Sequence, residues 1–269
     1  MNGEAILDLV RIVVLLFILV KSINLIKTNK HPVLVRFFTL AIACIMLSDF
    51  YWLAYDILCP ETRLPFAANE ISEWAMFLLL GAALTSRNPI KFFESKKEII
   101  GVFLFSAANV FLWIMWSGEW AQDILTGLAM GYFLCALTIQ LKAENSFTQK
   151  ESILITVICI VLILIQTSTF LVPAEYYIYL DHTAYLILFA TSFVLLRKVI
   201  LSIKKASPYS SLCTSVAYFA WNVITMYMSA DYFHLASMFL VIVSFAFMFH
   251  NLKKEVETTW FTLKTSLFV

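Results

Sequence analysis

Long runs of apolar residues, separated by short polar connections, extend over the whole sequence. Nine runs are long enough to cross a membrane, because a helix spanning the ~30 Å hydrocarbon core needs about 20 predominantly apolar residues. They cover residues 5–26, 33–58, 67–86, 98–117, 120–141, 152–172, 176–198, 209–228 and 231–251. Only Ser229 and Ala230 separate the last two runs, so a count of eight is the alternative. The pattern predicts an all-α, polytopic membrane bundle of about nine helices.

Lysine and arginine residues are distributed asymmetrically between the connections of this bundle. The even-numbered connections contain only Arg63, whereas the odd-numbered connections and the segment after the last run contain most of the others. These are Lys27, Lys30, Arg36, Arg87, Lys91, Lys96, Lys97, Lys142, Lys150, Arg197, Lys198, Lys204, Lys205, Lys253 and Lys254. Because basic loops stay in the cytoplasm, we expect the N-terminus outside and the C-terminus inside. The expected location is the plasma membrane, as a multi-pass protein of the bacterial inner membrane.

The composition supports the same class. Hydrophobic residues make up 61% of the chain, the mean hydropathy is +0.85, and 14% of residues are charged, whereas soluble domains are nearer half apolar and a quarter charged. A net charge of +1 provides no basic footprint for nucleic acid. The five cysteines form no Cys-x-x-Cys pair, so neither a disulfide framework nor a zinc knuckle is expected. The first run carries Asp8 and Arg11 and lacks a small-residue cleavage site, which indicates a retained helix.

The predicted helices are free of internal prolines. The prolines lie in connections or at helix ends, at Pro32, Pro60, Pro65, Pro89, Pro173 and Pro208. Transporters that bind their substrate at the membrane midplane often use helices interrupted by Gly or Pro, so this pattern counts against that kind of transporter. Gly127 and Gly131 have the small-xxx-small spacing that lets two membrane helices approach closely.

Acidic and aromatic side chains gather in the outer half of the predicted bundle. The acids are Glu4, Asp8, Asp49, Asp56, Glu61, Glu70, Glu73, Glu119, Asp123, Glu175, Asp181 and Asp231, opposed there by Arg11 and Arg63. The aromatic residues and histidines are Trp52, Tyr55, Trp74, Trp116, Trp120, Tyr176, Tyr177, Tyr227, Tyr232, His182 and His234. Interfacial aromatic belts and acids favoured at helix starts by the macrodipole account for part of this pattern.

Asp49 and Asp56 do not fit these explanations. Their helix runs from inside to outside, so both approach its negative C-terminal end. Asp49 lies about nine residues below the outer boundary, which is roughly 13 Å at 1.5 Å per residue. A carboxylate at that depth costs a few kcal/mol unless it is paired, wetted or protonated. Asp49 is therefore a candidate functional residue.

Two interpretations of Asp49 remain open. Arg11 on the first helix lies at a similar depth, so an Arg11–Asp49 ion pair would make both residues structural. Alternatively, Asp49, Trp52, Asp181 and His182 line a water-filled pocket that opens to the outside. Both hold if the ion pair forms the floor of the pocket.

The residue types in this outer zone suit a cation. Carboxylates attract an organic cation by Coulomb forces, and each aromatic ring adds a cation–π contact worth ~0.5–2 kcal/mol. The same groups suit protons, and acids with imidazoles could hold zinc, but no His-x-x-x-His spacing supports a metal site. We predict no metal, no other cofactor and no catalytic residue. The candidate ligand-binding residues are Asp49, Trp52, Tyr55, Asp56, Glu73, Trp74, Asp123, Asp181, His182, Asp231 and His234.

The sequence predicts a tail helix at residues 252–269, on the cytoplasmic side of a bundle formed by residues 1–251. An apolar stripe at helical spacing is formed by Leu252, Val256, Trp260, Leu263 and Leu267. Such a helix either lies on the inner membrane surface or binds a second copy of the chain or a signalling partner.

Three segments resemble the multi-pass sensory region at the N-terminus of bacterial membrane-bound signalling proteins. They are S-D-F-Y-W at Ser48–Trp52, Trp74 followed by F-L-L-L-G-A-A-L at Phe77–Leu84, and N-L-K-K-E-V-E-T-T at Asn251–Thr259. In those families a kinase, cyclase or regulator output domain follows. This chain ends about 18 residues after the last run, so we expect either a stand-alone receptor that acts through a partner or a different role.

The residues and the resemblance together favour a non-enzymatic membrane sensor for a small cationic ligand or protons. Its partners would be the bilayer, the ligand, and a cytoplasmic signalling protein or a second copy. A transporter of an organic cation or a proton-coupled solute is the first alternative, although the mostly apolar inner halves of the helices argue against a polar path. The second alternative is an intramembrane hydrolase of the lysoplasmalogenase or ceramidase kind, with Asp49, Asp181, His182, Asp231 and His234 as its site.

Overall fold

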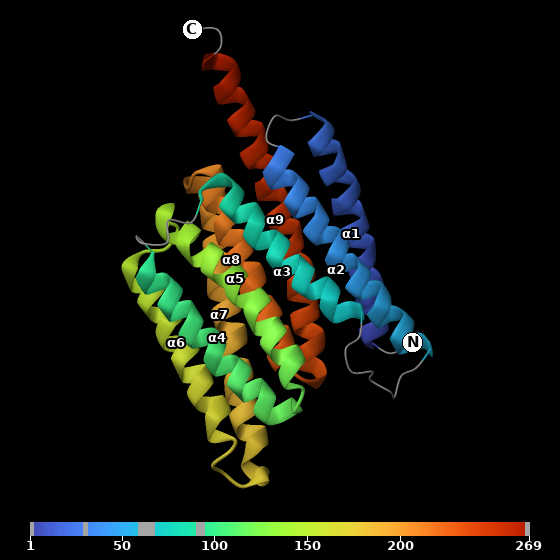
Figure 1. The fold of residues 1–269 in the computed structure, drawn as a ribbon, viewed down its shortest axis with the longest axis vertical. Coiled ribbons are helices and arrows are strands. Elements are labelled where there is room, and N and C mark those ends of the chain that lie inside the picture. The colour runs from blue at the N-terminus through green and yellow to red at the C-terminus, as the bar shows by residue number, and fades with distance from the viewer. Residues whose placement is uncertain (1–2, 29–31, 59–67, 90–94, 267–269) are drawn as a thin grey trace.

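The structure, a computed structural model, describes residues 3–28, 32–58, 68–89 and 95–266. In these ranges the chain forms nine α-helices and a short 3-10 helix and contains no strand (Figure 1). The prediction of an all-α fold is confirmed for these residues. The elements are α1 (Gly3–Thr28), α2 (Pro32–Leu58), α3 (Ala68–Arg87), α4 (Lys96–Ser117), α5 (Trp120–Ala143), α6 (Gln149–Ser168), η1 (Ala174–Tyr176), α7 (Tyr177–Lys205), α8 (Pro208–Met228) and α9 (Asp231–Ser266).

Local signals in the sequence set several of these boundaries. Thr148 and Glu151 form a capping box at the start of α6, which satisfies backbone N–H groups that the helix leaves free. Gly118 ends α4 with a positive φ of 74°, a conformation that glycine adopts without strain. Between α8 and α9 the chain reverses at Ser229 and Ala230, so the two apolar runs form two helices. In the described residues the last two runs are therefore not one bent element, which a count of eight would require.

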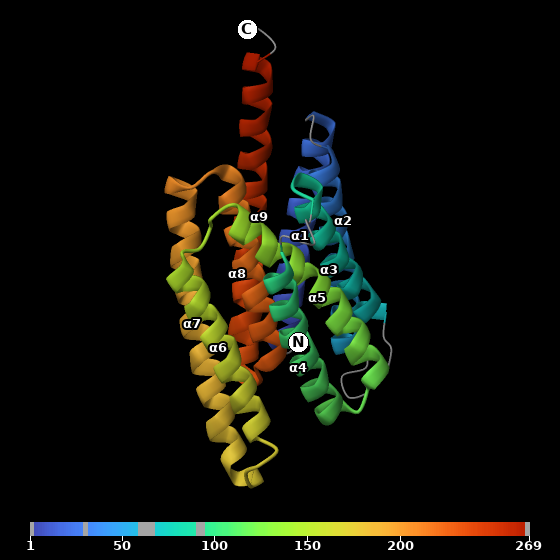
Figure 2. The ribbon, with the colours of Figure 1, turned by 60° about the vertical axis from the view of Figure 1, so that its left-hand side comes forward.

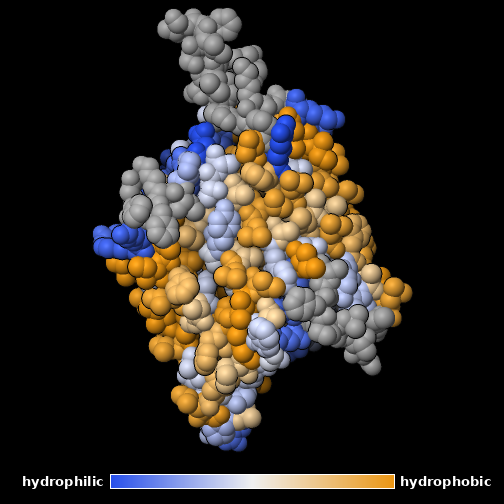
Figure 3. All heavy atoms as spheres, in the orientation of Figure 1, coloured by the Kyte–Doolittle hydropathy of each residue, from blue (hydrophilic) through white to orange (hydrophobic). Residues whose placement is uncertain are grey.

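Six of the described helical segments are long and apolar enough to cross a membrane. They are Val33–Tyr55, Lys96–Ser117, Trp120–Ala143, Gln149–Ser168, Ala174–Lys205 and Asp231–Thr258. Large apolar side chains are exposed on their outer faces, including Phe103, Leu104 and Phe111 of α4, and hydrophobic side chains dominate the middle of the face drawn in Figure 3. A chain with these segments has the character of a multi-pass membrane protein.

The helices run alternately up and down, which gives the bundle two distinct ends. We call the end where α1, α3, α5, α7 and α9 begin the head end; it lies at the bottom of Figure 1. We call the opposite end, beyond which α9 projects, the tail end (Figures 1 and 2).

Contacts between neighbouring helices trace a closed circuit in the order α1, α2, α3, α5, α4, α6, α7, α8, α9 and back to α1. A contact between α5 and α8 divides this circuit into two parts. On one side α1, α2, α3, α5, α8 and α9 form what we call the six-helix ring, whose core includes Phe77, Phe133 and Phe219. On the other side α6, α7 and α8 share a second apolar core around Leu188 and Tyr218.

Helix α8 is buried on all sides between these two cores. Several of its polar side chains form hydrogen bonds in the interior: Asn222 accepts one from Ser192 at 2.6 Å, and Ser215 accepts one from Asn251 at 2.6 Å. Thr214 donates to the backbone carbonyl four residues earlier. The centre of the bundle is therefore a polar helix, and the apolar pattern of the sequence did not distinguish it from its neighbours.

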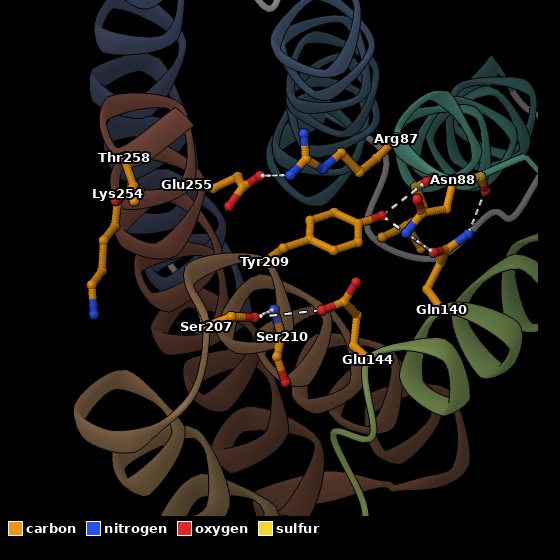
Figure 4. A network of polar contacts seen from close by, with 11 residues as sticks. Arg87, Asn88, Gln140, Glu144, Ser207, Tyr209, Ser210, Lys254, Glu255 and Thr258 are labelled. Carbon is orange, nitrogen blue, oxygen red and sulfur yellow. Dashed lines mark hydrogen bonds and ion pairs between the residues drawn. The ribbon is translucent and has the colours of Figure 1, made fainter. Parts of the chain in front are cut away.

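Helix α9 is one continuous helix of 36 residues, about 54 Å long at 1.5 Å per residue. The predicted boundary between a bundle and a separate tail at residue 252 does not coincide with a break in this helix. Leu252 and Val256 are buried against the bundle, and Glu255 forms an ion pair with Arg87 of α3 at 3.2 Å (Figure 4). The side chains of Trp260 and Leu263, and the whole of Leu267, lie outside the described residues.

Helices α4 and α5 approach closely at the two glycines of the small-xxx-small pattern. A Cβ atom on Gly127 would meet Val110 Cγ2 at 2.1 Å, and one on Gly131 would meet Ser106 Oγ at 3.0 Å. The glycines therefore allow the two backbones to approach each other, as expected for this spacing.

Candidate ligand-binding cavity

A cavity of about 540 Å³ lies inside the six-helix ring at its head end. Its polar lining comes from the head-end turns of α1, α2, α3, α5, α8 and α9, with a contribution from α4. The polar and aromatic lining residues are Glu4, Asp8, Arg11, Ser48, Trp52, Asn69, Glu70, Glu73, Trp113, Trp116, Ser117, Glu119, Gln122, Asp123, Thr126, Tyr227 and His234. Apolar side chains, among them Met76, Phe219 and Phe245, close it toward the bundle centre. The volume is sufficient for a small organic molecule.

The lining carries a strong excess of negative charge. Its carboxylates are Glu4, Asp8, Glu70, Glu73, Glu119 and Asp123. Arg11 is the guanidinium that faces them. Glu4 and Trp116 are exposed as well as lining, so the cavity reaches the protein surface. Carboxylates gathered in a hollow with low-dielectric walls raise the local concentration of cations.

Arg11 is held at the base of the polar lining by two carboxylates. Its Nη2 lies 2.6 Å from Asp49 Oδ1 and 3.1 Å from Asp8 Oδ1. Its Nη1 lies 3.6 Å from Met226 Sδ of α8. Asp49 is fully buried behind Arg11 and is not itself in the lining. The carboxylate on α2 is therefore paired, and the cavity begins on the other side of its partner.

Glu73 of α3 connects three helices of the cavity wall. Its carboxylate accepts a hydrogen bond from Ser48 Oγ of α2 at 2.8 Å and one from Tyr227 Oη of α8 at 2.5 Å. Trp74 follows Glu73 in α3, and its Nε1 donates a hydrogen bond to Thr126 Oγ1 of α5 at 2.7 Å. These bonds hold α2, α3, α5 and α8 in register around the cavity.

A cluster of two amides and a carboxylate lies in the wall between α3 and α5. Gln122 Nε2 donates to Glu70 Oε1 at 2.5 Å, and Asn69 is the neighbour of Glu70 in the first turn of α3. Asn69, Glu70 and Gln122 are 3%, 6% and 8% exposed. Among the described residues no donor reaches Asn69 Oδ1 or Gln122 Oε1. We call Asn69, Glu70 and Gln122 the amide cluster.

Aromatic rings complete the wall. Trp52 of α2 packs edge to face on Tyr55 with ring centroids 5.9 Å apart. Trp116 of α4 packs on Phe170 at 5.2 Å, and Trp113 lies one turn before it in the lining. These rings provide the apolar surface against which an organic cation can pack.

The predicted site residues are divided between several places. Trp52, Glu73, Asp123 and His234 line the cavity; Asp123 accepts a hydrogen bond from Ser117 at 2.6 Å, and His234 Nδ1 lies 3.0 Å from the Met226 carbonyl. Asp49, Tyr55 and Trp74 support the wall from behind. The side chain of Asp56 lies outside the described residues, as do Glu61 and Arg63.

Asp181, His182 and Asp231 do not join the cavity. Asp181 and His182 lie on α7, which packs on α6 and α8 outside the six-helix ring. The His182 ring packs against Phe233 at 5.9 Å and Tyr185 at 6.2 Å. The predicted pocket shared by Asp49, Trp52, Asp181 and His182 is therefore not formed, because α8 stands between α7 and the cavity.

Several lining residues were not predicted as site residues, among them Asn69, Glu70, Trp113 and Gln122. The acid was explained as an ordinary helix start, and the amides carry no charge to mark them. Their position could have identified them as candidates, because each lies within two helical turns of the predicted outer boundary.

Within the described residues, no group of three or more His, Cys, Asp or Glu side chains is placed to hold a metal ion.

Comparisons of the chain with protein-family models, with curated proteins and with solved structures found no match. The chemistry of the cavity therefore rests on its own geometry. It combines excess carboxylate charge, buried acceptor atoms and aromatic walls, and this combination favours a small cation that carries an apolar body.

Proposed function

We propose that this protein is a membrane receptor that binds a small organic cation in the head-end cavity and transmits binding to its other side through α9. The observation that supports this most directly is the path of α9. His234, Met238 and Phe245 of this helix line the cavity, and Glu255 of the same unbroken helix pairs with Arg87 at the tail end. One rigid element thus links a ligand site to the opposite end of the bundle.

The cation specificity follows from the charges in the lining. Arg11 is already neutralised by Asp8 and Asp49, so the carboxylates of Glu70 and Glu73 add net negative charge. A cation in the cavity compensates this charge and gains contacts with Trp52 and Trp113. An anion would meet repulsion from the same groups.

The transmission step requires two packings of α9 that differ in affinity for the ligand. A differential affinity of about 1–3 kcal/mol is enough to shift such an equilibrium. At the tail end α9 is held by Arg87–Glu255 and by Lys254 Nζ, which donates to the Ile203 carbonyl at 2.8 Å. Arg87 and Lys254 are partly exposed in these contacts, so a shift of α9 can change them.

The charge distribution supports a head end that faces outward. Lysines and arginines lie at the tail end, in the last turns of α1, α5 and α7 and near the end of α9. Basic segments remain on the cytoplasmic side. We infer that the cavity opens to the outside of the cell and that α9 projects into the cytoplasm, with a bacterial inner membrane as the proposed location.

A transporter is the second candidate, and α8 is the observation that favours it. The buried hydroxyls and amides of Ser211, Ser215 and Asn222 run along this helix from the tail end toward the cavity. They are bonded to backbone carbonyls, to Ser192 of α7 and to Asn251 of α9, and a rearrangement of these helices would open them to water. Uptake of labelled n-butylammonium into proteoliposomes, above that into empty liposomes, would favour this candidate over the receptor.

A distance measurement tests the receptor directly. Spin labels are placed on Thr258→Cys of α9 and Lys205→Cys of α7, both exposed at the tail end, after the native cysteines are replaced by serine. We expect n-butylammonium or n-butyltrimethylammonium to bind at millimolar or lower concentration and to shift the distance distribution between the labels. An unchanged distribution at saturating cation would contradict transmission, and absence of binding would contradict the receptor altogether.

A matched variant isolates the role of α9. The pair Ala246→Gly and His250→Gly lies on the exposed face of α9, between the cavity and the tail end, and destabilises the helix by about 1 kcal/mol per glycine. Cation binding should persist in this variant, while the shift at Thr258 falls by at least half. A full shift in the softened helix would show that another element carries the signal.

A further inference from the structure

We propose that the amide cluster of Asn69, Glu70 and Gln122 binds a primary ammonium group, so that the ligand of the cavity is a primary amine and not a quaternary ammonium ion. This inference deepens the proposed function and depends on it, because it places the charged end of the cation at one wall of the same cavity. Glu70 supplies the negative charge, and the two amide oxygens supply the specificity.

The orientation of Gln122 is set by its hydrogen bond. Its Nε2 donates to the Glu70 carboxylate, and an amide oxygen in that position would face another acceptor. Gln122 Oε1 must therefore point away from Glu70. It is buried, it belongs to a lining residue, and no donor among the described residues reaches it.

Asn69 provides a second acceptor of the same kind. It is 3% exposed and lines the cavity, and no described donor reaches its Oδ1. Buried side-chain acceptors in folded proteins nearly always have a partner. One such oxygen on α3 and one on α5 belong to lining residues of the same cavity, and we infer that their donor enters from that cavity.

An alkylammonium group meets this requirement. Its –NH₃⁺ head has three N–H donors and no acceptor, which suits an environment of Asn69 Oδ1, Gln122 Oε1 and the Glu70 carboxylate. A quaternary ammonium carries the same charge without any N–H. It would bury both amide oxygens against methyl groups, and a site built to hydrogen-bond an N–H rejects analogues that lack it.

The rest of the cavity argues against an inorganic ion as the ligand. A sodium ion could also be coordinated by amide and carboxylate oxygens, but it would leave most of the 540 Å³ empty. Trp113, Trp116 and Phe219 line that remaining space, and an aliphatic or aromatic body of the amine would pack on them.

The primary ammonium could belong to a free amine or to the ethanolamine headgroup of a membrane lipid. The chemistry at the amide cluster is the same in both cases. A lipid would enter from the outer leaflet, and its acyl chains would remain in the bilayer. The experiment therefore varies both the soluble amine and the lipid.

The test uses the full chain in nanodiscs of phosphatidylcholine, titrated with n-butylamine and its N-methyl, N,N-dimethyl and N,N,N-trimethyl derivatives, with binding followed by calorimetry. We expect affinity to fall stepwise with each methyl group, by at least tenfold from the primary amine to the quaternary ion. This series needs no variant. Equal affinity across the series would overturn the inference.

Two variants assign the preference to the cluster. Gln122→Met and Asn69→Leu should each reduce the preference for the primary amine to less than threefold. Gln140→Met makes the same replacement on the same helix at the tail end, outside the cavity lining, and should leave the preference intact. A preference that survives in Gln122→Met, or one lost equally in Gln140→Met, would contradict the assignment.

Further experiments distinguish a free amine from a lipid headgroup, and failure of this inference from failure of the proposed function. Replacing half of the phosphatidylcholine by phosphatidylethanolamine should weaken n-butylamine binding if the lipid headgroup is the natural occupant, and leave it unchanged if a free amine is. Competition by sodium at millimolar concentration, without any effect of N-methylation, would overturn the ammonium assignment. Equal binding of primary and quaternary ions that depends on Glu73 would support the receptor and contradict the role of the amide cluster. Absence of binding by either ion would contradict both proposals.

Discussion

Helix α5 presents the same residue type to the six-helix ring at both of its ends. Gln122 lies at the head end and Gln140 at the tail end; five helical turns, about 27 Å, separate them, so they face the same side of α5. Gln140 Nε2 donates to the Asn88 carbonyl at 2.7 Å, and its Oε1 accepts from Asn88 Nδ2 at 3.3 Å and from Tyr209 Oη at 3.5 Å (Figure 4). Gln122 Oε1 has no described donor.

The two ends also differ in how they hold an arginine. At the head end Arg11 is buried, and its carboxylate partners are buried as well. At the tail end the Arg87 side chain is 36% exposed and its partner Glu255 is 6% exposed. Both amide atoms of Gln140 thus have partners at the tail end, whereas at the head end Asn69 and Gln122 of the cavity lining have buried amide oxygens that no described donor reaches. We attribute the difference to a ligand that is shared by the head-end groups.

The largest expected effect comes from removing the arginine at each end. Arg11→Met leaves Asp8 and Asp49 buried without a counter-charge, and loss of one partner of a buried pair costs about 3–5 kcal/mol. Arg87→Met removes a pair in which the arginine is 36% exposed and Glu255 is 6% exposed, so we expect a smaller loss, about 1–3 kcal/mol, for the carboxylate that remains. Thermal unfolding followed by tryptophan fluorescence should show a large fall for the first variant and a smaller one for the second. Equal falls would contradict the distinction between the two ends.

A smaller loss of stability is expected from Gln140→Met. The change removes the partners of Asn88 and weakens the hydrogen bonding of Tyr209, and a buried polar group left without a partner costs about 1–3 kcal/mol. Binding of n-butylamine should be unaffected, since Gln140 is outside the cavity lining. A variant that unfolds like the wild-type protein would show that the tail-end bonds contribute nothing measurable.

The smallest expected effect is on affinity. Glu73→Gln keeps the shape of the side chain and one acceptor oxygen, replaces the other oxygen by an NH2 donor beside the hydroxyl of Ser48 or Tyr227, and removes one negative charge from the cavity wall. We expect n-butylamine to bind about tenfold more weakly, which corresponds to about 1.4 kcal/mol. Glu144→Gln is the matched control, because Glu144 accepts a bond from Ser207 at the tail end. Equal affinity in the two variants would argue against electrostatic attraction by the cavity.

The depth of a residue along its helix could be predicted from the sequence, because apolar runs and a fixed rise per residue determine it. The nine helices and the level shared by Arg11 and Asp49 follow from that reasoning. The order of the helices around the bundle does not follow from it. Asp181 and His182 have a predicted depth that would suit the cavity, but α8 separates them from it. The packing of the helices determines this separation, and the pattern along one helix does not contain it.

The central position of α8 and the amide cluster were missed for related reasons. Ser215 and Asn222 lower the hydropathy of α8 without adding charge, so the sequence predicted one span among nine and did not mark this helix as the core of the bundle. Asn69 and Gln122 acquire meaning only when α3 and α5 bring them together beside Glu70. A pattern along one helix cannot reveal which acceptors will share a donor.

Chemical access to the cavity tests the central claim most directly. Met226→Cys, in the cavity lining, and Met248→Cys, buried on α9 outside it, are each introduced after the native cysteines are replaced. Intact cells are then treated with a membrane-impermeant methanethiosulfonate that carries either a trimethylammonium or a sulfonate group. We predict that Met226→Cys reacts from outside, at least tenfold faster with the cationic reagent, and that Met248→Cys does not react. Equal rates for the two reagents, or no reaction of Met226→Cys from outside, would contradict a cation-binding cavity that opens to the exterior.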